Sequence, residues 1–232
     1  MSLSTPWRAS GGASLPATES ATPRATSPSV EPVYWFPEIT GWFQECEALH
    51  LFTAIRLVRP TRILEIGTFY GRSTATICSA IASNRGPDPV EFISCDLDFR
   101  SESEFSRLFG AIHQVAEVRP PAECKEAFAR GLSTLEYARL QLDRYDLLSF
   151  VQLRGGDFRQ ISGTFDMIFA DVLHDKREIG ANLPAILAKL ADDGILAVHD
   201  MTDENRNTIQ YISRDLRFIS QSAYLGLFRF ES

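Results

Sequence analysis

A strand, a glycine turn and a helix follow one another within residues 61–80, and this order constrains the fold more than any other part of the chain. The apolar run 63–66 predicts a buried strand, which breaks at Gly67 and Gly71 before a helix that opens at Arg72. Glycine lets backbone approach a ligand closely, and the helix start offers free N–H groups and a partial positive charge. Doubly wound α/β folds hold nucleotide-like ligands in this way, so we expect such a fold and a ligand site here.

The glycine turn differs from the dinucleotide fingerprint G-x-G-x-x-G, because Phe69 stands where the middle glycine would be. Instead, Glu65 precedes Gly67 by two residues and Ser73 follows Gly71 by two. A carboxylate at the end of the strand would repel a pyrophosphate but would pair with a cationic ligand. S-adenosylmethionine carries an amine and a sulfonium and no phosphate, so it suits this turn. An ordinary glycine turn without a ligand is the alternative.

Composition limits the partners of the chain. Its 232 residues suffice for one domain with a sizeable core, or for one domain with an appendage. A net charge of −7 argues against nucleic acid or an anionic membrane as the main partner. No apolar run approaches the roughly 20 residues that span a bilayer. The lack of a signal-peptide core and of any C-x-x-C pair predicts a cytoplasmic protein with reduced cysteines.

The N-terminal part divides into a tail, an arm and a helix. Residues 1–30 are rich in Ser, Thr, Ala, Pro and Gly without apolar periodicity, which predicts a disordered tail. Residues 31–59 form an aromatic arm and a helix. The aromatic part, 31–43, either docks the N-terminus on the domain or lines a substrate entrance. Residues 44–58 predict an amphipathic helix. Its apolar residues are Leu49, Phe52, Ile55 and Leu57.

Strands and helices alternate through residues 60–232. After the first strand, strands are predicted at 90–95, 147–153, 165–170 and 195–199, a helix closes near Gly194, another covers 203–216, and two β runs at 217–220 and 224–230 form a hairpin. This pattern predicts an α/β fold with a doubly wound, mostly parallel seven-stranded sheet that ends in an antiparallel β-hairpin.

A helical insertion, residues 101–146, separates the second and third predicted strands. Two helices are expected in it, at 102–117 and 122–145, on either side of two prolines. The insertion is longer than a plain crossover needs. It either caps the ligand site or forms an oligomer contact, such as that of a homodimer.

Every parallel strand is followed by an acidic residue at its carboxyl end, where ligands bind in such sheets. The five acids are Glu65, Asp96, Asp157, Asp171 and Asp200. Gathered like charges cost free energy unless cations or hydrogen bonds offset them, which a cationic cofactor and a divalent metal would do. Asp96, with Asp98 as the alternate, is the candidate for binding ribose hydroxyls. A solvated loop acid is the alternative for this position.

The chain resembles the class I S-adenosylmethionine-dependent methyltransferases over about residues 60–230. It is most similar to the small-molecule O-methyltransferases of the catechol and caffeoyl-CoA type and to relatives that act on sugars and natural products. The resemblance rests on EIGTFYGRS at residues 65–73, because that family has E-[LI]-G-x-x-x-G-x-S here. It also rests on Asp171-x-x-His174-Asp175 and on Asp200 after a glycine-led strand, where the family places two metal-binding aspartates and a Lys or His.

The resemblance implies methyl transfer from S-adenosylmethionine to a hydroxyl of a small-molecule acceptor: a sugar, a phenol or a natural product. His174 would be the general base beside Asp171, and Asp171 and Asp200 would hold a Mg²⁺-like ion. The methionine end of the cofactor is assigned to Glu65, Gly67 and Ser73, the ribose to Asp96, and the adenine to Asp157 and Phe158. Thr68, Phe69, Gly71, Leu97 and Asp171 complete the implied cofactor site.

One departure from the family pattern concerns the metal. Catechol-type enzymes have Asn directly after the second aspartate, whereas this chain has Met201, and a thioether is a poor ligand for magnesium. A third protein ligand is then missing, or comes from His199, Asp203 or Asn205. For His174, the alternative is a surface histidine in a charged loop.

Two other functions remain open at this point. One is a nicotinamide-dependent oxidoreductase, against which Phe69 and the C-terminal hairpin argue. The other is a catalytically degenerate module that still binds S-adenosylmethionine, for which Met201 is the only indication.

Overall fold

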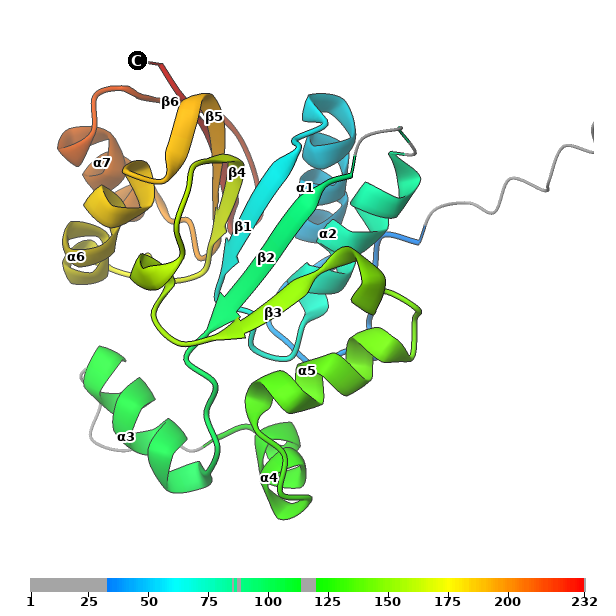
Figure 1. Ribbon diagram of the computed structural model, residues 1–232. Coiled ribbons are helices and arrows are strands. Elements are labelled where there is room, and N and C mark those ends of the chain that lie inside the picture. Colours follow the sequence, from blue (N-terminus) through cyan, green and yellow to red (C-terminus); the bar gives the residue numbers. More distant parts are fainter. Residues whose placement is uncertain (1–32, 85, 87–88, 114–119, 232) are drawn as a thin grey trace, which may run out of the picture. The chain divides into compact units, whose positions relative to one another are not determined.

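A seven-stranded sheet forms the centre of the computed structural model, which describes residues 33–84, 86, 89–113 and 120–231 (Figure 1). The strand order is β3-β2-β1-β4-β5-β7-β6. Strands β1 to β5 pair in parallel, and β7 lies antiparallel between β5 and β6. The predicted mostly parallel sheet with a C-terminal hairpin is therefore confirmed. The predicted disordered tail, residues 1–30, lies outside the described residues.

The bounds of the elements follow the chain. The strands are β1 Arg62–Ile66, β2 Glu91–Asp96, β3 Gln152–Gly155, β4 Phe165–Ala170, β5 Leu190–Val198, β6 Leu216–Ser222 and β7 Leu225–Phe230. The helices are α1 Glu45–Val58, α2 Arg72–Ser83, α3 Glu102–His113, α4 Ala122–Ala129, α5 Thr134–Asp143, α6 Lys176–Leu187 and α7 Asp203–Ile212. Among the described residues, no helix is both long enough and apolar enough to cross a membrane.

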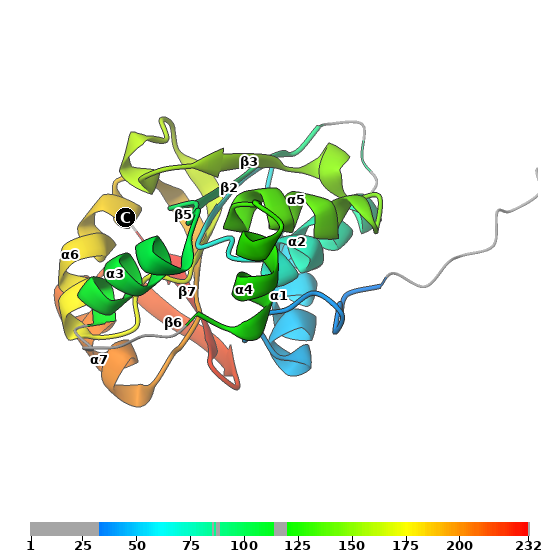
Figure 2. The ribbon, with the colours of Figure 1, turned by 90° about the horizontal axis from the view of Figure 1, so that it is seen from below.

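Helices cover both faces of the sheet. Successive side chains of a strand point to opposite faces, so Ile63 belongs to the hydrophobic cluster under α1, α2 and α5, whereas Leu64 belongs to the cluster under α6 and α7. Seen from below, the two helical layers lie on either side of the sheet (Figure 2). Burial on both faces explains why β1 and β4 read as nearly continuous apolar runs.

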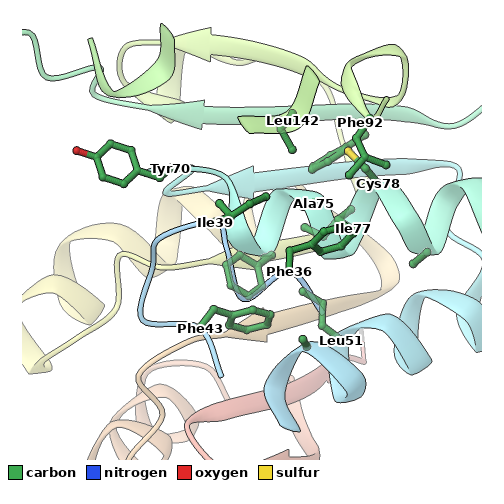
Figure 3. Close-up of a cluster of buried hydrophobic side chains, with 14 of the residues drawn as sticks. Phe36, Ile39, Phe43, Leu51, Tyr70, Ala75, Ile77, Cys78, Phe92 and Leu142 are labelled. Carbon is green, nitrogen blue, oxygen red and sulfur yellow. The ribbon is translucent and has the colours of Figure 1, made fainter. Parts of the chain in front are cut away.

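The aromatic arm packs into the first of these clusters. Phe36, Ile39 and Phe43 are buried together with Leu51 of α1 and Ile77 of α2 (Figure 3). These arm residues pack on the domain, whereas Trp42 and Phe43 also line the cavity described below, so both interpretations of the arm keep support.

The apolar face of α1 differs from the predicted one. Leu49 and Leu57 are 47% and 79% exposed, so their assignment to the apolar face was wrong. Spacings of three and four residues place a different set toward the sheet, and Glu47 shares that buried face. The buried apolar residues are Ala48, Leu51, Phe52 and Ile55.

The insertion contains three described helices where two were predicted. The predicted helix at 122–145 is interrupted because Gly131 adopts a left-handed φ of 72° after α4. The hydroxyl of Ser133 then accepts a hydrogen bond from the backbone N–H of Glu136, and the carboxylate of Glu136 accepts one from the N–H of Ser133. This capping box starts α5.

Three further boundaries were also wrong. The run predicted as a strand at 147–153 begins with the 3₁₀ turn Leu148–Phe150, whose apolar residues pack against the first cluster, and β3 pairs with β2 only from Gln152 onward. Strand β5 begins at Leu190 rather than 195, so α6 ends at Leu187 rather than near Gly194. Helix α7 ends at Ile212 rather than 216.

Arg72, the first residue of α2, holds the arm in place. Its guanidinium donates hydrogen bonds to the carbonyl oxygens of Ile39, Gly41, Phe43 and Pro37, the last three at 2.6, 3.1 and 3.2 Å. The same group lies 5.0 Å from the ring centre of Trp35. One side chain thus satisfies four backbone acceptors of a segment that has no regular secondary structure.

We expect Arg72→Met to lower the free energy of unfolding by about 2 kcal/mol or more, because it leaves these carbonyl groups without their charged donor. Arg139→Met, on the exposed side of α5, is the matched control and should change stability little. Urea unfolding measures both values, and limited proteolysis reports release of the arm. Equal stability of the two variants would show that the arm is held by its aromatic residues alone.

Candidate functional site

A cavity of about 1060 Å³ opens at the carboxyl ends of the parallel strands. The glycine turn, the ends of β2, β4 and β5, and the arm all contribute to its wall. Phe105 and Leu108 of α3 also line it, and α3 lies beyond the carboxyl ends of the strands (Figure 1). The insertion therefore contributes to the wall of the cavity, and its role as a cap or as an oligomer contact stays a prediction.

The glycine turn brings two strand ends together. Gly67 has a φ of 101°, and a Cβ atom there would lie 3.0 Å from the Cβ of Asp171 and 3.2 Å from its carbonyl oxygen. Only glycine fits both this conformation and this contact. Phe69 adopts a φ of 46° at the next bend, in the left-handed region that non-glycine residues take uncommonly. Gly71 supplies the left-handed N-cap of α2.

Glu65 lies beneath the cavity and is not part of its wall. It is fully buried, and its carboxylate accepts hydrogen bonds from the hydroxyls of Ser73, Thr74 and Ser94 at 2.5, 2.6 and 2.5 Å. Burial raises the pKa of Glu65 to about 7, although these three hydroxyls act in the opposite direction. Of the three hydroxyl groups that Glu65 accepts from, that of Ser73 belongs to a residue that lines the cavity.

The two acids at the carboxyl end of β2 make different contacts. Asp96 lines the cavity, and its carboxylate accepts hydrogen bonds from the backbone N–H groups of Phe69 at 2.8 Å and Asp98 at 3.2 Å. Burial raises the pKa of Asp96. Asp98, the alternate candidate, instead accepts from the N–H of Leu135 at the start of α5 and pairs with Arg100. The first acid, rather than the second, faces the space for a ligand.

The predicted adenine end lies on the same wall. Leu97, Asp157 and Phe158 all line the cavity, and Phe158 is buried. The carboxylate of Asp157 caps a short 3₁₀ helix by accepting from the N–H of Arg159, whose guanidinium lies 4.8 Å from the ring centre of Phe158. Thr68 also lines the cavity, and its hydroxyl lies 2.6 Å from that of Ser94.

Asp171, His174 and Asp200 converge at the centre of the wall. One ligand atom from each of the three residues lies within 4.8 Å of the others. The Nε2 atom of His174 is 3.4 Å from Oδ1 of Asp171 and 3.5 Å from Oδ2 of Asp200. The Nδ1 atom is 2.6 Å from Oε2 of Glu178 on α6, and Asp175 caps that helix. His174 is thus built into an acidic cluster rather than placed in a solvated loop.

Neighbouring carboxylates raise the pKa of both histidines of this region. Burial alone would lower the pKa of His174, but hydrogen bonds to Asp171 and Glu178 raise it to about 10. The pKa of His199 is likewise raised to about 10 by Asp171 and Glu47 against the effect of burial. Burial would raise the pKa of Asp171, yet its bonds to the two imidazoles hold that pKa well below the usual range.

The residues considered as a third metal ligand do not join the cluster. The Nδ1 atom of His199 lies 2.9 Å from Asp171 and 3.8 Å from Asp200, but His199 is not in the group of three ligand atoms within 4.8 Å of one another, and its Nε2 atom contacts Glu47. The amide of Asn205 donates to three backbone carbonyl groups, and Asp203 pairs with Arg206. Met201 is buried against Gly226. Among the described residues, the group that could hold a metal ion therefore consists of Asp171, His174 and Asp200.

Glu47 and Tyr224 were missed by the sequence reasoning. Glu47 is completely buried and accepts from the N–H groups of Gln44 and Tyr224, at 2.7 and 2.9 Å. Its position on the apolar face of α1 was the available signal. Tyr224 lines the cavity from the turn of the hairpin, a place that only the tertiary fold defines.

Comparison with known proteins identifies a family. Residues 64–201 match a family model described as a methyltransferase domain. The match begins in β1 and ends directly after Asp200, so it spans every strand end that contributes to the cavity. A search of curated protein sequences finds no match.

Solved structures of methyltransferases share the fold. The O-methyltransferase TomG of Streptomyces achromogenes, involved in tomaymycin synthesis and solved with SAM, is 17% identical over 84% of this chain and 83% of its own, with a TM-score of 0.51. An O-methyltransferase of Bacillus cereus with SAH is 14% identical over 84% and 85%, with a TM-score of 0.53. A SAH-bound methyltransferase of Podospora anserina is 14% identical over 85% and 83%, with a TM-score of 0.51.

We expect Glu65→Gln to remove a pH dependence of stability. Because folding raises the pKa of Glu65 from the ordinary 4.5 to about 7, its contribution is fully present below pH 4.5 and is lost as the pH rises through 7. The stability difference between wild type and variant should therefore change by roughly 3 kcal/mol between pH 4.5 and 8. Urea unfolding at both pH values measures it, with the exposed Glu126→Gln as control. A constant difference would mean that Glu65 stays ionised in the folded protein.

Proposed function

Because the chain belongs to the methyltransferase-domain family, we propose that it transfers a methyl group from S-adenosylmethionine to a hydroxyl oxygen of a small-molecule acceptor. The observation that carries this proposal is the position of Asp171, His174 and Asp200 in the same cavity as the glycine turn. A cofactor bound along that turn would place its reactive end beside groups that can take up a proton. The family favours this chemistry over the nicotinamide-dependent alternative.

The residues present fit the proposed cofactor. Gly67 lines the cavity without a side chain, so backbone can approach a ligand there, and Ser73 offers a polar wall at the start of α2. Asp96 can accept hydrogen bonds from ribose hydroxyls, and Phe158 offers an apolar surface for the adenine. The acidic wall also complements a sulfonium, which explains why the cavity tolerates so many carboxylates. When bound, S-adenosylmethionine supplies the methyl group.

His174 is the proposed general base of the reaction. Methyl transfer is an in-line displacement, so aligning the acceptor oxygen is a large part of catalysis, and the base removes the hydroxyl proton. With a pKa of about 10, the imidazole of the free protein is mostly protonated at neutral pH. A bound cation would lower that pKa and so prepare the ring to accept a proton.

A divalent ion is a second proposal for the same three residues. Two carboxylates and an imidazole are a suitable donor set for such an ion, although magnesium prefers oxygen ligands alone. When bound, the ion would favour ionisation of the acceptor hydroxyl. His174 cannot bind metal through Nε2 and accept the proton with the same atom. The base and ligand roles of His174 are therefore alternatives that experiment can separate.

We expect Gly67→Ala to weaken the binding of S-adenosylhomocysteine at least about tenfold, because the methyl group meets Asp171 and strains the turn. Gly131→Ala is the matched control, since Gly131 has a φ of 72° but no atom within 4 Å of the added carbon. Isothermal titration calorimetry measures both affinities. Equal affinities of the two variants for S-adenosylhomocysteine would show that the glycine turn does not contact the cofactor.

We expect His174→Ala to lower kcat at least about 100-fold while S-adenosylhomocysteine affinity changes little, because a positioned base is lost. The wild-type rate should rise with pH as the imidazole becomes neutral. Transfer of labelled methyl groups to a panel of phenols and sugars measures the rate, with His50→Ala as a control outside the cavity. If the wild type keeps full activity in EDTA, His174 acts as the general base. If EDTA removes the activity and Mg²⁺ or Mn²⁺ restores it, His174 acts as a metal ligand. A loss below about fivefold in His174→Ala would contradict both roles.

A further inference from the structure

We propose that His199 is a positioning residue for Asp171, and that Glu47 of α1 orients the His199 ring for this task. Whether this positioning matters for catalysis rests on the proposed function, in which Asp171 belongs to the acidic cluster. The geometric part of the proposal, however, concerns residues that the structure describes directly. Neither His199 nor Glu47 carries a role in the reaction proposed above.

The contact between His199 and Asp171 is short and sheltered. The Nδ1 atom of His199 lies 2.9 Å from Oδ1 of Asp171, the same oxygen that His174 approaches to 3.4 Å. The His199 side chain is only 6% exposed, so water competes little for this hydrogen bond. Two imidazoles of the cavity wall thus contact Asp171, and that of His199 is the more deeply buried. Its carboxylate cannot turn without breaking the His199 bond.

Packing and Glu47 fix the ring of His199. Phe43 meets the imidazole edge-on, with ring centres 5.6 Å apart, and Phe169 lies nearly parallel to it at 6.4 Å. The Nε2 atom lies 3.4 Å from Oε2 of Glu47. Two backbone N–H groups donate hydrogen bonds to that carboxylate, so the position of Glu47 does not depend on His199 alone. A line of contacts therefore runs from α1 through Glu47 and His199 to Asp171.

Two substitutions of His199 separate positioning from simple packing. In His199→Asn, the amide nitrogen can replace Nδ1 and still donate to Asp171, but the contact with Glu47 is lost. In His199→Gln, the longer side chain can replace Nε2 and keep the contact with Glu47, but the donor to Asp171 is lost. Loss of its partner leaves a buried carboxylate poorly compensated, so we expect His199→Asn to melt at a lower temperature than His199→Gln.

The decisive measurement is NMR of the histidine rings in the full-length chain labelled with ¹⁵N-histidine, without cofactor. The chain has four histidines, so single variants assign the signals. We expect the ring signals of His174 to stay near their wild-type positions in the less stable His199→Asn and to move in the more stable His199→Gln. The more stable variant would then show the larger change in the His174 signals. A purely structural role of His199 predicts the opposite, with the larger change in the less stable variant.

The proposal would be overturned if the His174 signals followed the order of stability, or if neither substitution moved them. Crystal structures of the two variants provide a second check, with the Asp171 carboxylate retained in His199→Asn and rotated in His199→Gln. Titration of the wild type with S-adenosylhomocysteine keeps the two proposals distinct. A wild type that does not bind it would count against the proposed function and would leave the ring measurements, made without cofactor, fully informative.

Discussion

The close approach of Gly67 to Asp171 sets the geometry of the whole cavity. The backbone N–H of Asp171 donates to the carbonyl oxygen of Ile66 at 2.9 Å, so β4 ends beside the point where β1 turns. This contact brings the glycine turn and the acidic cluster into one wall. It also places the cluster at the position where the strand order changes direction, since β1 pairs with β2 on one side and β4 on the other. Without a glycine at position 67, the two halves of the site would separate.

Two neighbouring carboxylates differ in charge because their partners differ. Glu65 is surrounded by neutral hydroxyls, so burial favours its protonated form, whereas Asp171 lies between two imidazoles and stays ionised. The negative charge of the site is therefore concentrated where a cationic ligand can reach it. The acid beneath the turn instead ties β1 to α2 and β2 through Ser73, Thr74 and Ser94. Position along the sequence gave no indication of this division, because both residues lie at strand ends.

Local patterns and sheet geometry account for what could be predicted from the sequence. Glycines and an apolar run identify the β1 turn without tertiary information, and parallel strands necessarily bring Asp171 and Asp200 to one edge. The run before β3 was misassigned because hydrophobicity alone does not distinguish packing under a helix from pairing in a sheet. The link from Glu47 to His199 joins residues 152 positions apart in the chain, so no local pattern encodes it. Sequence reasoning thus predicted much of the cavity wall, such as Asp96, Asp171 and His174, but it missed Tyr224 in the wall and Glu47 behind it.

Arg72 makes the N-terminal arm and the start of α2 parts of one equilibrium. The backbone of this residue begins the helix that borders the cavity, and its guanidinium closes the arm over the same region. A ligand that orders the first turn of α2 therefore also stabilises the docked arm, and reciprocity requires that the docked arm increases the affinity for that ligand by the same factor. Binding of such a ligand in the cavity would therefore slow hydrogen exchange of the arm's backbone amides, although the arm forms only part of the cavity wall. If such a ligand binds in this cavity, the arm would contribute to its affinity through this coupling as well as through the residues it places in the wall.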